Sequence, residues 1–399
     1  MTTHQTLRGR IVSASLTVAD GIIAVADGVI TFAGPASDFT GEAGPAQPDR
    51  ILLPGLVDLH CHGAVGSDFA EGSVAGSTAA AKYLHSRGTT TLLASVVTGP
   101  AEQTLRSLHV LRDLADRGVI AGSHLEGPFL SSHQCGAHEP SLLRAPDLDY
   151  TTSLLAAAGT SLASMTVAAE LPGADGLVDL LTEHGVIPSL GHTAAETEKA
   201  SAFLARAAAG LAAASPAGQD RTKPTVTHLF NAMPSLHHRA PGPIAASLDA
   251  ARAGKAVVEL IADGVHLASQ TVKLVFDLVG AQNIVLVTDS MAATGLQDGQ
   301  YMLGPLGVTV DQGVARLDTT GAIAGGTATL LDVVGSAVSA GVSLADAVIS
   351  ATSVPASVLG LTKTAGDLRA GMPADVVITN PDLVLEGVLR RGEWVAELR

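Results

Sequence analysis

Cysteine, aromatic residues and basic residues are all scarce in this chain of 399 residues. Its two cysteines, Cys61 and Cys135, give no disulfide framework of the kind that stabilises exported proteins. Aromatic residues make up 3% and the formal net charge is −15, which argues against nucleic acid or an anionic membrane as a partner. The N-terminus lacks a signal-peptide pattern, and no apolar run is long enough to span a membrane. We therefore expect a cytoplasmic protein that acts on a small molecule.

Hydrophobic residues make up 47% of the chain, so there is material for a large core. Apolar, strand-like runs alternate with helix-like segments. The eight runs are Leu53–Cys61, Thr89–Val97, Val119–Leu125, Met165–Ala169, Val186–Leu190, Thr225–Leu229, Ala256–Ile261 and Ile284–Thr288. The clearest helical segments are Ala75–Ser86, Ala101–Asp116, Ala194–Leu211 and Ala328–Ala340. This alternation predicts a parallel sheet with helical crossovers, and eight strands favour closure into a (β/α)₈ barrel of the TIM type.

Short strand patterns also occur at both ends of the chain. They are Arg10–Ala19, Gly21–Ala26 and Gly28–Ala33 near the N-terminus, and Ala374–Thr379 and Gly387–Arg391 near the C-terminus. Two or three short strands are marginal alone, so we expect the two ends to pair. The predicted organisation is a small β-sandwich domain built from residues 1–52 and 363–399, and a metal-dependent catalytic barrel over residues 53–362.

Two histidines lie at the end of the first strand-like run, in His60-Cys61-His62. Residues two apart on a strand face the same way, so both imidazoles can point into the barrel mouth while Cys61 points away. Reactive groups of such barrels lie at the carboxyl ends of the strands, and imidazole nitrogen suits Zn²⁺ and similar ions. The pair therefore indicates a metal site.

Other ligand-type side chains end other strands: Glu126 follows the third run, His192 the fifth, His228 the sixth and Asp289 the eighth. A carboxylate at the end of an apolar strand is costly to bury unpaired, so Glu126 is expected to need a cation. With His192 and His228 it supplies the ligand set of many catalytic zinc sites. Asp289 is placed to touch water on the metal. Each histidine alone fits a structural role, but their shared position favours a metal centre.

Longer motifs resemble one enzyme family. They are His124-Leu125-Glu126-Gly127-Pro128-Phe129, Gly191-His192-Thr193, Thr227-His228-Leu229-Phe230-Asn231-Ala232-Met233, Ile261-Ala262-Asp263-Gly264-Val265-His266, Leu286-Val287-Thr288-Asp289 and Met291-Ala292-Ala293-Thr294-Gly295. Taken in order along the barrel, they resemble those of N-acetylglucosamine-6-phosphate deacetylase, a family of the amidohydrolase superfamily. The resemblance implies a (β/α)₈ barrel with a β-sandwich from both termini, and usually a homodimer.

The resemblance also implies metal ligands. Glu126, His192 and His228 match the principal ligands, while His60 and His62 match a pair found in members that can bind two metals. One or two ions are therefore expected, with Glu126 bridging. Many superfamily relatives use a carboxylated lysine after strand four, where this chain has Ala169-Glu170-Leu171-Pro172, which argues against dihydroorotase or hydantoinase chemistry. Zn²⁺ is the expected metal, with Fe²⁺, Mn²⁺ and Co²⁺ left open because these ligands accept all four.

The implied activity is metal-dependent hydrolysis of the N-acetyl group of N-acetylglucosamine 6-phosphate, in amino-sugar catabolism or cell-wall recycling. In the expected mechanism the metal activates water, and Asp289 accepts its proton and then protonates the departing amine. His138, which matches a family histidine, stabilises the oxyanion together with the metal. N-acetylgalactosamine 6-phosphate and other N-acyl compounds remain alternatives, because they would use the same metal ligands.

The phosphate end of the substrate also has candidates. The predicted substrate-binding residues are Ala137, His138, Asn231, Ala232, Arg239 and His266. Asn231 and Ala232 can offer backbone N–H groups, while Arg239 and His266 can offer charge-assisted hydrogen bonds. In the resembled family the matching arginine and histidine contact the sugar phosphate, and a neighbouring subunit of the homodimer contributes.

Arg239→Ala tests this assignment. We expect the variant to raise KM for the phosphorylated sugar much more than KM for the unphosphorylated sugar, because a dianion loses a charged donor. Steady-state kinetics on the two substrates measure the difference. Equal effects on both would reject a phosphate role for Arg239.

Overall fold

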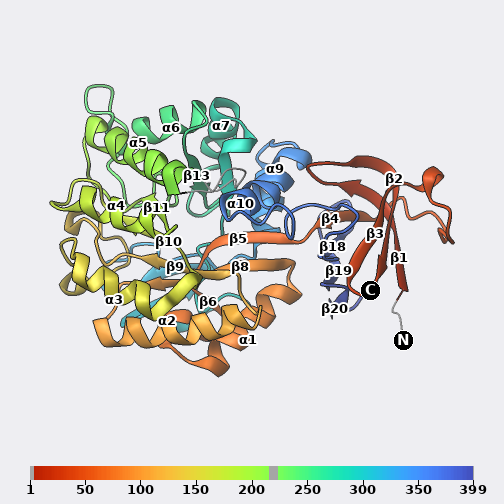
Figure 1. Cartoon of the computed structure of the whole chain (residues 1–399), viewed down its shortest axis with the longest axis horizontal. Coiled ribbons are helices and arrows are strands. Elements are labelled where there is room, and N and C mark those ends of the chain that lie inside the picture. Colours follow the sequence, from red (N-terminus) through yellow and green to blue (C-terminus); the bar gives the residue numbers. More distant parts are fainter. Residues whose placement is uncertain (1–3, 215–222, 399) are drawn as a thin grey trace.

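The computed structural model describes residues 4–214 and 223–398 of the chain, so residues 1–3 and 399 of the predicted terminal domain lie outside the described part. Figure 1 shows a barrel wrapped by helices and, beside it, a sheet in which red strands from the start of the chain lie against blue strands from its end. The barrel carries the ligand-type side chains, so its construction determines the geometry of the site.

The barrel consists of eight parallel strands in the order β14-β13-β12-β11-β10-β9-β8-β5. Their bounds are β5 (Leu56–Cys61), β8 (Thr89–Val97), β9 (Gly122–Glu126), β10 (Leu162–Val167), β11 (Ile187–Leu190), β12 (Thr225–Val226), β13 (Val257–Leu260) and β14 (Ile284–Leu286). Beyond β14 the circle closes onto β5, because the Asp289 N–H donates to the His60 carbonyl at 2.8 Å and the His62 N–H to the Ser290 carbonyl at 2.6 Å. The predicted barrel is confirmed.

Helices cover the outside of the barrel. They are α1 (Val74–Ser86), α2 (Ala101–Asp116), α3 (Leu148–Ala158), α4 (Ala174–Glu183), α5 (Thr197–Ala214), α6 (Gly242–Arg252), α7 (Ser269–Val279), α8 (Leu330–Ser339), α9 (Leu344–Ser350) and α10 (Ser353–Val358). Their apolar spacing explains their packing: on α2, Leu108, Leu111 and Leu114 recur every three residues and are fully buried. The described helices include none that is both long and apolar enough to cross a membrane.

The two ends of the chain pair in one seven-stranded sheet with the order β20-β19-β18-β4-β1-β2-β3. Its strands are β1 (His4–Val12), β2 (Thr17–Ala26), β3 (Val29–Pro35), β4 (Ile51–Pro54), β18 (Val376–Thr379), β19 (Leu385–Arg390) and β20 (Glu393–Ala396). The central strand β4 runs parallel to β1 and antiparallel to β18. The predicted pairing of both termini is therefore confirmed.

Two of the runs predicted as single strands are divided in the structure. The run Arg10–Ala19 is not one strand, because the chain turns after β1, where the Ser13 hydroxyl accepts the Leu16 N–H at 3.1 Å. The run Leu53–Cys61 is divided at Gly55 into β4 of the terminal sheet and β5 of the barrel. One continuous segment thus links the two sheets and leads directly to the His60 and His62 pair.

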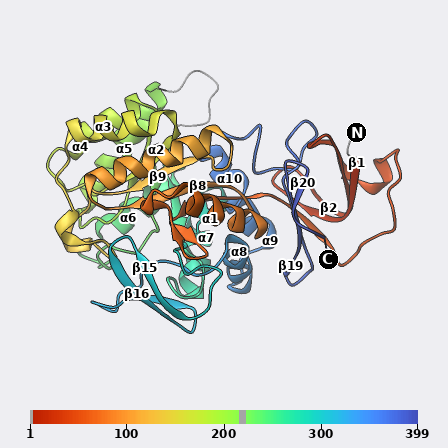
Figure 2. The ribbon, with the colours of Figure 1, turned by 90° about the horizontal axis from the view of Figure 1, so that it is seen from below.

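A small antiparallel sheet was not predicted. It contains β15 (Gly299–Leu303), β16 (Leu306–Asp311) and β17 (Val314–Leu317) and follows the last barrel strand. Figure 2 shows β15 and β16 in teal on the barrel, away from the terminal sheet. A second short hairpin, β6 (Gly63–Ala64) with β7 (Ser67–Asp68), follows β5. These pieces bring Leu303 and the segment after β17 to the mouth of the barrel.

A buried chain of polar side chains joins the barrel strands from within. Both ring nitrogens of His124 form hydrogen bonds: Nδ1 with Ser95 Oγ at 3.0 Å, and Nε2 with Thr166 Oγ1 at 2.8 Å. Thr166 is in turn bonded to Thr227 at 2.8 Å, and Thr227 to Ser189 at 2.6 Å. Because each group finds a partner, this layer is not penalised for burial. It links β8, β9, β10 and β11 to the residue after β12.

Candidate metal centre

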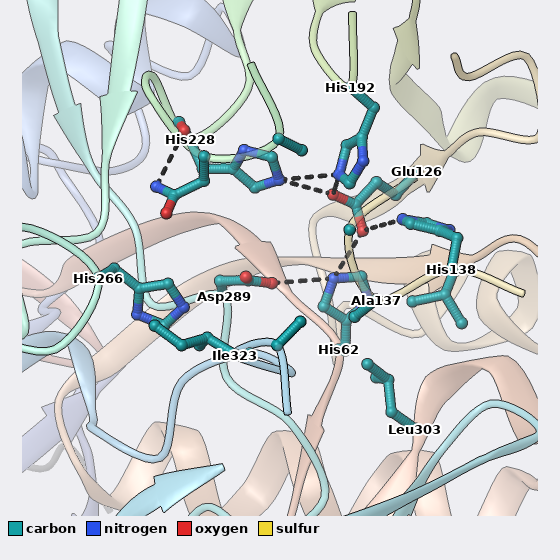
Figure 3. Close-up of a pocket in the computed structure, with 16 residues that line it drawn as sticks. His62, Glu126, Ala137, His138, His192, His228, His266, Asp289, Leu303 and Ile323 are labelled. Carbon is teal, nitrogen blue, oxygen red and sulfur yellow. Dashed lines mark hydrogen bonds and ion pairs between the residues drawn. The ribbon is translucent and has the colours of Figure 1, made fainter. Parts of the chain in front are cut away.

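Six ligand-type side chains converge at the barrel mouth in two clusters. The His60 cluster consists of His60, His62 and Asp289, and the Glu126 cluster consists of Glu126, His192 and His228. Within each cluster the ligand atoms all lie within 4.8 Å of one another. In Figure 3 the labelled side chains of these clusters point toward a common centre. His60 is fully buried and does not line the cavity. The structure therefore brings together all six residues that the sequence singled out as metal ligands.

Glu126 connects the two clusters. Its Oε1 atom lies 2.9 Å from His228 Nε2 and 3.0 Å from His192 Nε2, while Oε2 lies 3.2 Å from His62 Nε2. One carboxylate oxygen thus faces each cluster. This is the arrangement that a bridging carboxylate requires.

The backbone turns sharply where three of these residues leave their strands. His192, His228 and Asp289 have φ angles of 47°, 28° and 48°, in the left-handed region that residues with a side chain rarely adopt. Each such residue costs on the order of 1–3 kcal/mol. The turns direct the three side chains inward from strands β11, β12 and β14, so the strain belongs to the construction of the site.

The facing imidazoles fit a cation between them. His60 Nε2 lies 3.0 Å from His62 Nε2, and His192 Nε2 lies 3.1 Å from His228 Nε2. His62 Nδ1 and His228 Nδ1 are buried without a hydrogen-bond partner. Nitrogen lone pairs and two carboxylates therefore point at the same small volume, a donor set that suits Zn²⁺ and similar divalent ions.

The charges of the site demand a positive partner. Burial raises the pKa of Glu126, but His60 and His138 outweigh this and hold that pKa well below its ordinary value. For Asp289, His60 and His62 likewise overcome burial and lower the pKa. Burial alone lowers the pKa of His62, yet its bonds to Asp289 and Glu126 raise the pKa to about 9. The clusters thus attract positive charge, and a divalent cation competes with protons for them.

His138 takes a different role. The Thr98 N–H donates to His138 Nδ1 at 3.3 Å, so the ring proton lies on Nε2, which is 3.2 Å from Glu126 Oε2. Burial, partly opposed by Glu126, lowers the pKa of His138 to about 4, so the imidazole is neutral near pH 7. A neutral imidazole with its N–H directed at the centre is a hydrogen-bond donor for an oxygen that develops negative charge.

A cavity of about 280 Å³ opens above the centre. Five of the six predicted substrate-binding residues line it: Ala137, His138, Asn231, Ala232 and His266. Arg239 is not among the lining residues and is exposed on the loop before α6. The Asn231 N–H, predicted to be offered to phosphate, donates instead to the His228 carbonyl at 3.0 Å, because the chain makes a tight turn there.

The sequence reasoning missed several residues around the centre. Apolar side chains complete the cavity wall, namely Val97, Leu303, Ala322 and Ile323. In Figure 3, Leu303 lies on the side of His62 and His138, and Ile323 lies near His266. Leu303 comes from the unpredicted antiparallel sheet, and Ile323 comes from the segment after β17. Glu259 was also missed, although a lone acidic residue within the apolar run Ala256–Ile261 is a visible signal.

His266 is held by a carboxylate. Its Nδ1 lies 2.8 Å from Asp263 Oδ2, and both side chains are nearly buried. Burial lowers the pKa of His266, but the hydrogen bond and charge of Asp263 outweigh this and raise it. The second ring nitrogen remains to meet a ligand, so a protonated His266 offers the cavity a positive charge at its rim.

Residues 51–395 match the model of the amidohydrolase family. The chain belongs to the amidohydrolase family. Among solved structures, N-acetyl-D-glucosamine-6-phosphate deacetylase from Mycobacterium smegmatis, a mutant in complex with N-acetyl-D-glucosamine-6-phosphate, is 35% identical. The structural alignment covers 99% of this chain and 100% of the Mycobacterium smegmatis chain, with a TM-score of 0.91.

Two curated relatives extend the comparison. N-acetylglucosamine-6-phosphate deacetylase of Vibrio furnissii is 31% identical over 352 residues, which cover 86% of this chain and 82% of the relative. N-acetylgalactosamine-6-phosphate deacetylase of Escherichia coli O157:H7 is 30% identical over 348 residues, which cover 86% and 87%. The resemblance of the motifs to N-acetylglucosamine-6-phosphate deacetylases is therefore confirmed within this amidohydrolase.

Metal removal should destabilise the protein. A ligand that binds only the folded state at a thousandfold excess over its Kd adds about 4 kcal/mol of stability. We expect Zn²⁺, Mn²⁺ or Co²⁺ to raise the melting temperature of chelator-treated protein by several degrees, as measured by scanning calorimetry. Glu126→Gln should abolish most of this gain, whereas Glu139→Gln on the exposed loop should retain it. A full gain in Glu126→Gln would remove Glu126 from the centre.

Proposed function

We propose that this amidohydrolase removes the acetyl group from N-acetylglucosamine 6-phosphate, giving glucosamine 6-phosphate and acetate. The support that carries most weight is the Mycobacterium smegmatis complex, whose bound ligand is that sugar phosphate and whose fold matches almost the whole chain. The cavity above the two clusters agrees with this function, because it offers a place for an acetamide next to both acidic and neutral catalytic groups.

Asp289 is suited to carry the proton of the reaction. Its Oδ1 atom lies 3.1 Å from His62 Nε2, and its depressed pKa keeps it ionised near neutral pH. When bound at these clusters, a divalent cation, for which we propose Zn²⁺, supplies an acidified water and polarises a carbonyl oxygen. Asp289 accepts a proton from the attacking water and delivers it to the nitrogen of the leaving amine.

His138 complements Asp289 across the cavity. Its Nε2–H faces the centre because the Thr98 N–H occupies the other ring nitrogen. As water attacks the acetyl carbon, the amide oxygen gains negative charge and His138 donates a hydrogen bond to it. In the structure this N–H lies 3.2 Å from Glu126 Oε2, so it changes partner when it donates to the substrate, but the ring is already neutral and directed at the centre.

The phosphate group is proposed to lie toward His266 and the Asn231–Ala232 turn. His266 contributes a positive charge supported by Asp263. Arg239 lies outside the cavity of its own subunit, which supports a homodimer in which the partner subunit completes the phosphate site. The exposed loop 234–240 is accessible for such a contact. The galactosamine epimer is a second candidate, because a curated deacetylase of that sugar phosphate is 30% identical.

Acetate release tests the proposed function. Metal-loaded protein should release acetate from N-acetylglucosamine 6-phosphate faster than from N-acetylgalactosamine 6-phosphate in a coupled acetate assay. Asp289→Asn should lower kcat by about a hundredfold or more, since general acid–base catalysis is typically worth that much. The ion of the Glu126 cluster should persist in the variant, because Glu126, His192 and His228 are unchanged.

Asp277→Asn is the matched control, because it removes an aspartate charge from the surface of α7, where Asp277 pairs with Lys273. It should leave kcat unchanged. Near-normal turnover in Asp289→Asn would remove Asp289 from the proton transfer. No acetate from either epimer would reject the function itself.

Asp263→Asn should make phosphate recognition more sensitive to pH. In the native protein the raised pKa of His266 keeps it protonated to higher pH, and this advantage is lost as pH rises through that pKa. Without the Asp263 charge, His266 should lose its proton at lower pH. We expect the variant-to-native ratio of kcat/KM to fall severalfold between pH 6 and pH 8. A constant ratio over that range would contradict the role of the pair.

A further inference from the structure

Glu259 is a buried acidic residue that the proposed reaction does not use. It lies in β13 among apolar neighbours, is 4% exposed and does not line the cavity. Its Oε2 atom is 3.3 Å from His60 Nδ1 and accepts the His228 N–H at 3.2 Å. A single carboxylate oxygen therefore touches one residue of each cluster.

The contact with His60 determines where the imidazole carries its proton. An ionised carboxylate can only accept hydrogen bonds, so His60 Nδ1 must donate. The lone pair then lies on Nε2, which faces His62 Nε2 at 3.0 Å and Asp289 Oδ1 at 3.4 Å. Glu259 thus presents the ligand atom of His60 to the interior of the His60 cluster.

The other imidazoles of the centre lack such a carboxylate. His192 Nδ1 is bonded to the Gln134 carbonyl at 2.9 Å, whereas His62 Nδ1 and His228 Nδ1 have no hydrogen-bond partner. In the His60 cluster, Glu259 therefore orients one of the two rings, that of His60. Partners that orient a metal-bound histidine in this way typically change metal affinity by about 10–100-fold when they are removed.

We infer that Glu259 is a positioning residue that fixes the His60 imidazole and so sets the affinity of the His60 cluster for its ion. This inference rests on the proposed function, because it assumes that the clusters hold catalytic metal. It also accounts for the burial of an acid within β13, since the hydrogen bonds from His60 and from the His228 N–H offset the cost of desolvating a carboxylate.

Binding of Co²⁺ to metal-free protein tests the inference without any turnover. Calorimetric titration and the visible absorption of Co²⁺ give the number of ions and the Kd of each. His60→Ala identifies the ion of the His60 cluster as the one it weakens or removes. Glu259→Gln keeps the size of the side chain, but its amide can donate to Nδ1 and let the proton move to Nε2. We expect it to weaken the same ion 10–100-fold.

Two comparisons make the result specific. In a double-mutant cycle, Glu259→Gln should cause little further loss once His60 is alanine. Asp375→Asn, which neutralises a buried carboxylate just before β18, should leave both affinities unchanged. Melting of the metal-free variants should show that they fold. Four outcomes would each overturn the inference. Glu259→Gln could leave both affinities unchanged, weaken both ions equally, or cause the same loss of affinity in the His60→Ala background as in the native one. The native protein could also bind a single ion whose affinity His60→Ala does not change.

The proposed function fails separately. The Co²⁺ affinities could follow this cycle while the native protein releases no acetate. In that case the positioning role of Glu259 would stand and the deacetylase function would be rejected.

Discussion

The contacts between one buried carboxylate, that of Glu126, and the imidazoles around it determine how the barrel mouth is built. Glu126 is 4% exposed and lies within 3.2 Å of nitrogen atoms of His62, His138, His192 and His228. Such a charge is tolerated in an apolar barrel only where hydrogen-bonding or cationic partners are held close to it. The strand ends, the left-handed turns and the polar layer below all serve to hold those partners in place.

The support beneath the centre is itself polar and fully paired. The side-chain layer from Ser95 to Ser189 runs through His124, whose ring lies 4.6 Å from that of His60. Asp58 adds a second tie, because it accepts hydrogen bonds from the Thr288 hydroxyl and the His60 N–H. Satisfied networks of this kind favour one arrangement of the interior over its alternatives. They allow strained residues such as Asp289 to persist at the rim.

The sequence carried enough information for the barrel and for the ligand-type side chains that gather at its mouth. Apolar runs that end at or near His60, Glu126, His192 and Asp289 predict parallel strands whose carboxyl ends lie together. The structure has this arrangement. Side-chain partners across strands are harder to predict, because contacts such as Glu259 with His60 depend on the closed barrel and not on spacing along the chain. The division of the chain at residues 52 and 363 stays a prediction.

Two other features could not be predicted from the pattern of apolar and polar residues. The insertion from Gly299 to Leu317 has the alternating exposure of a partly solvated antiparallel sheet, and its polar positions resemble a loop in the sequence. Arg239 was assigned to the phosphate by resemblance, yet it is exposed outside the cavity of its own chain. An exposed loop arginine has no distinguishing signal in the periodicity of one sequence, so the assignment rests on the family motif.

The position of β4 in the terminal sheet has a consequence for how the protein is made. β4 leads through Gly55 into the strand of His60 and His62, and one of its two edges is covered by β18, close to the C-terminus. During synthesis on the ribosome the first two imidazoles of the centre, those of His60 and His62, emerge early, while the strand before them keeps an open edge until nearly all of the chain has followed. The terminal sheet thus stays incomplete at β4, and a nascent chain depends on protection of that edge from wrong pairing until its last strands arrive.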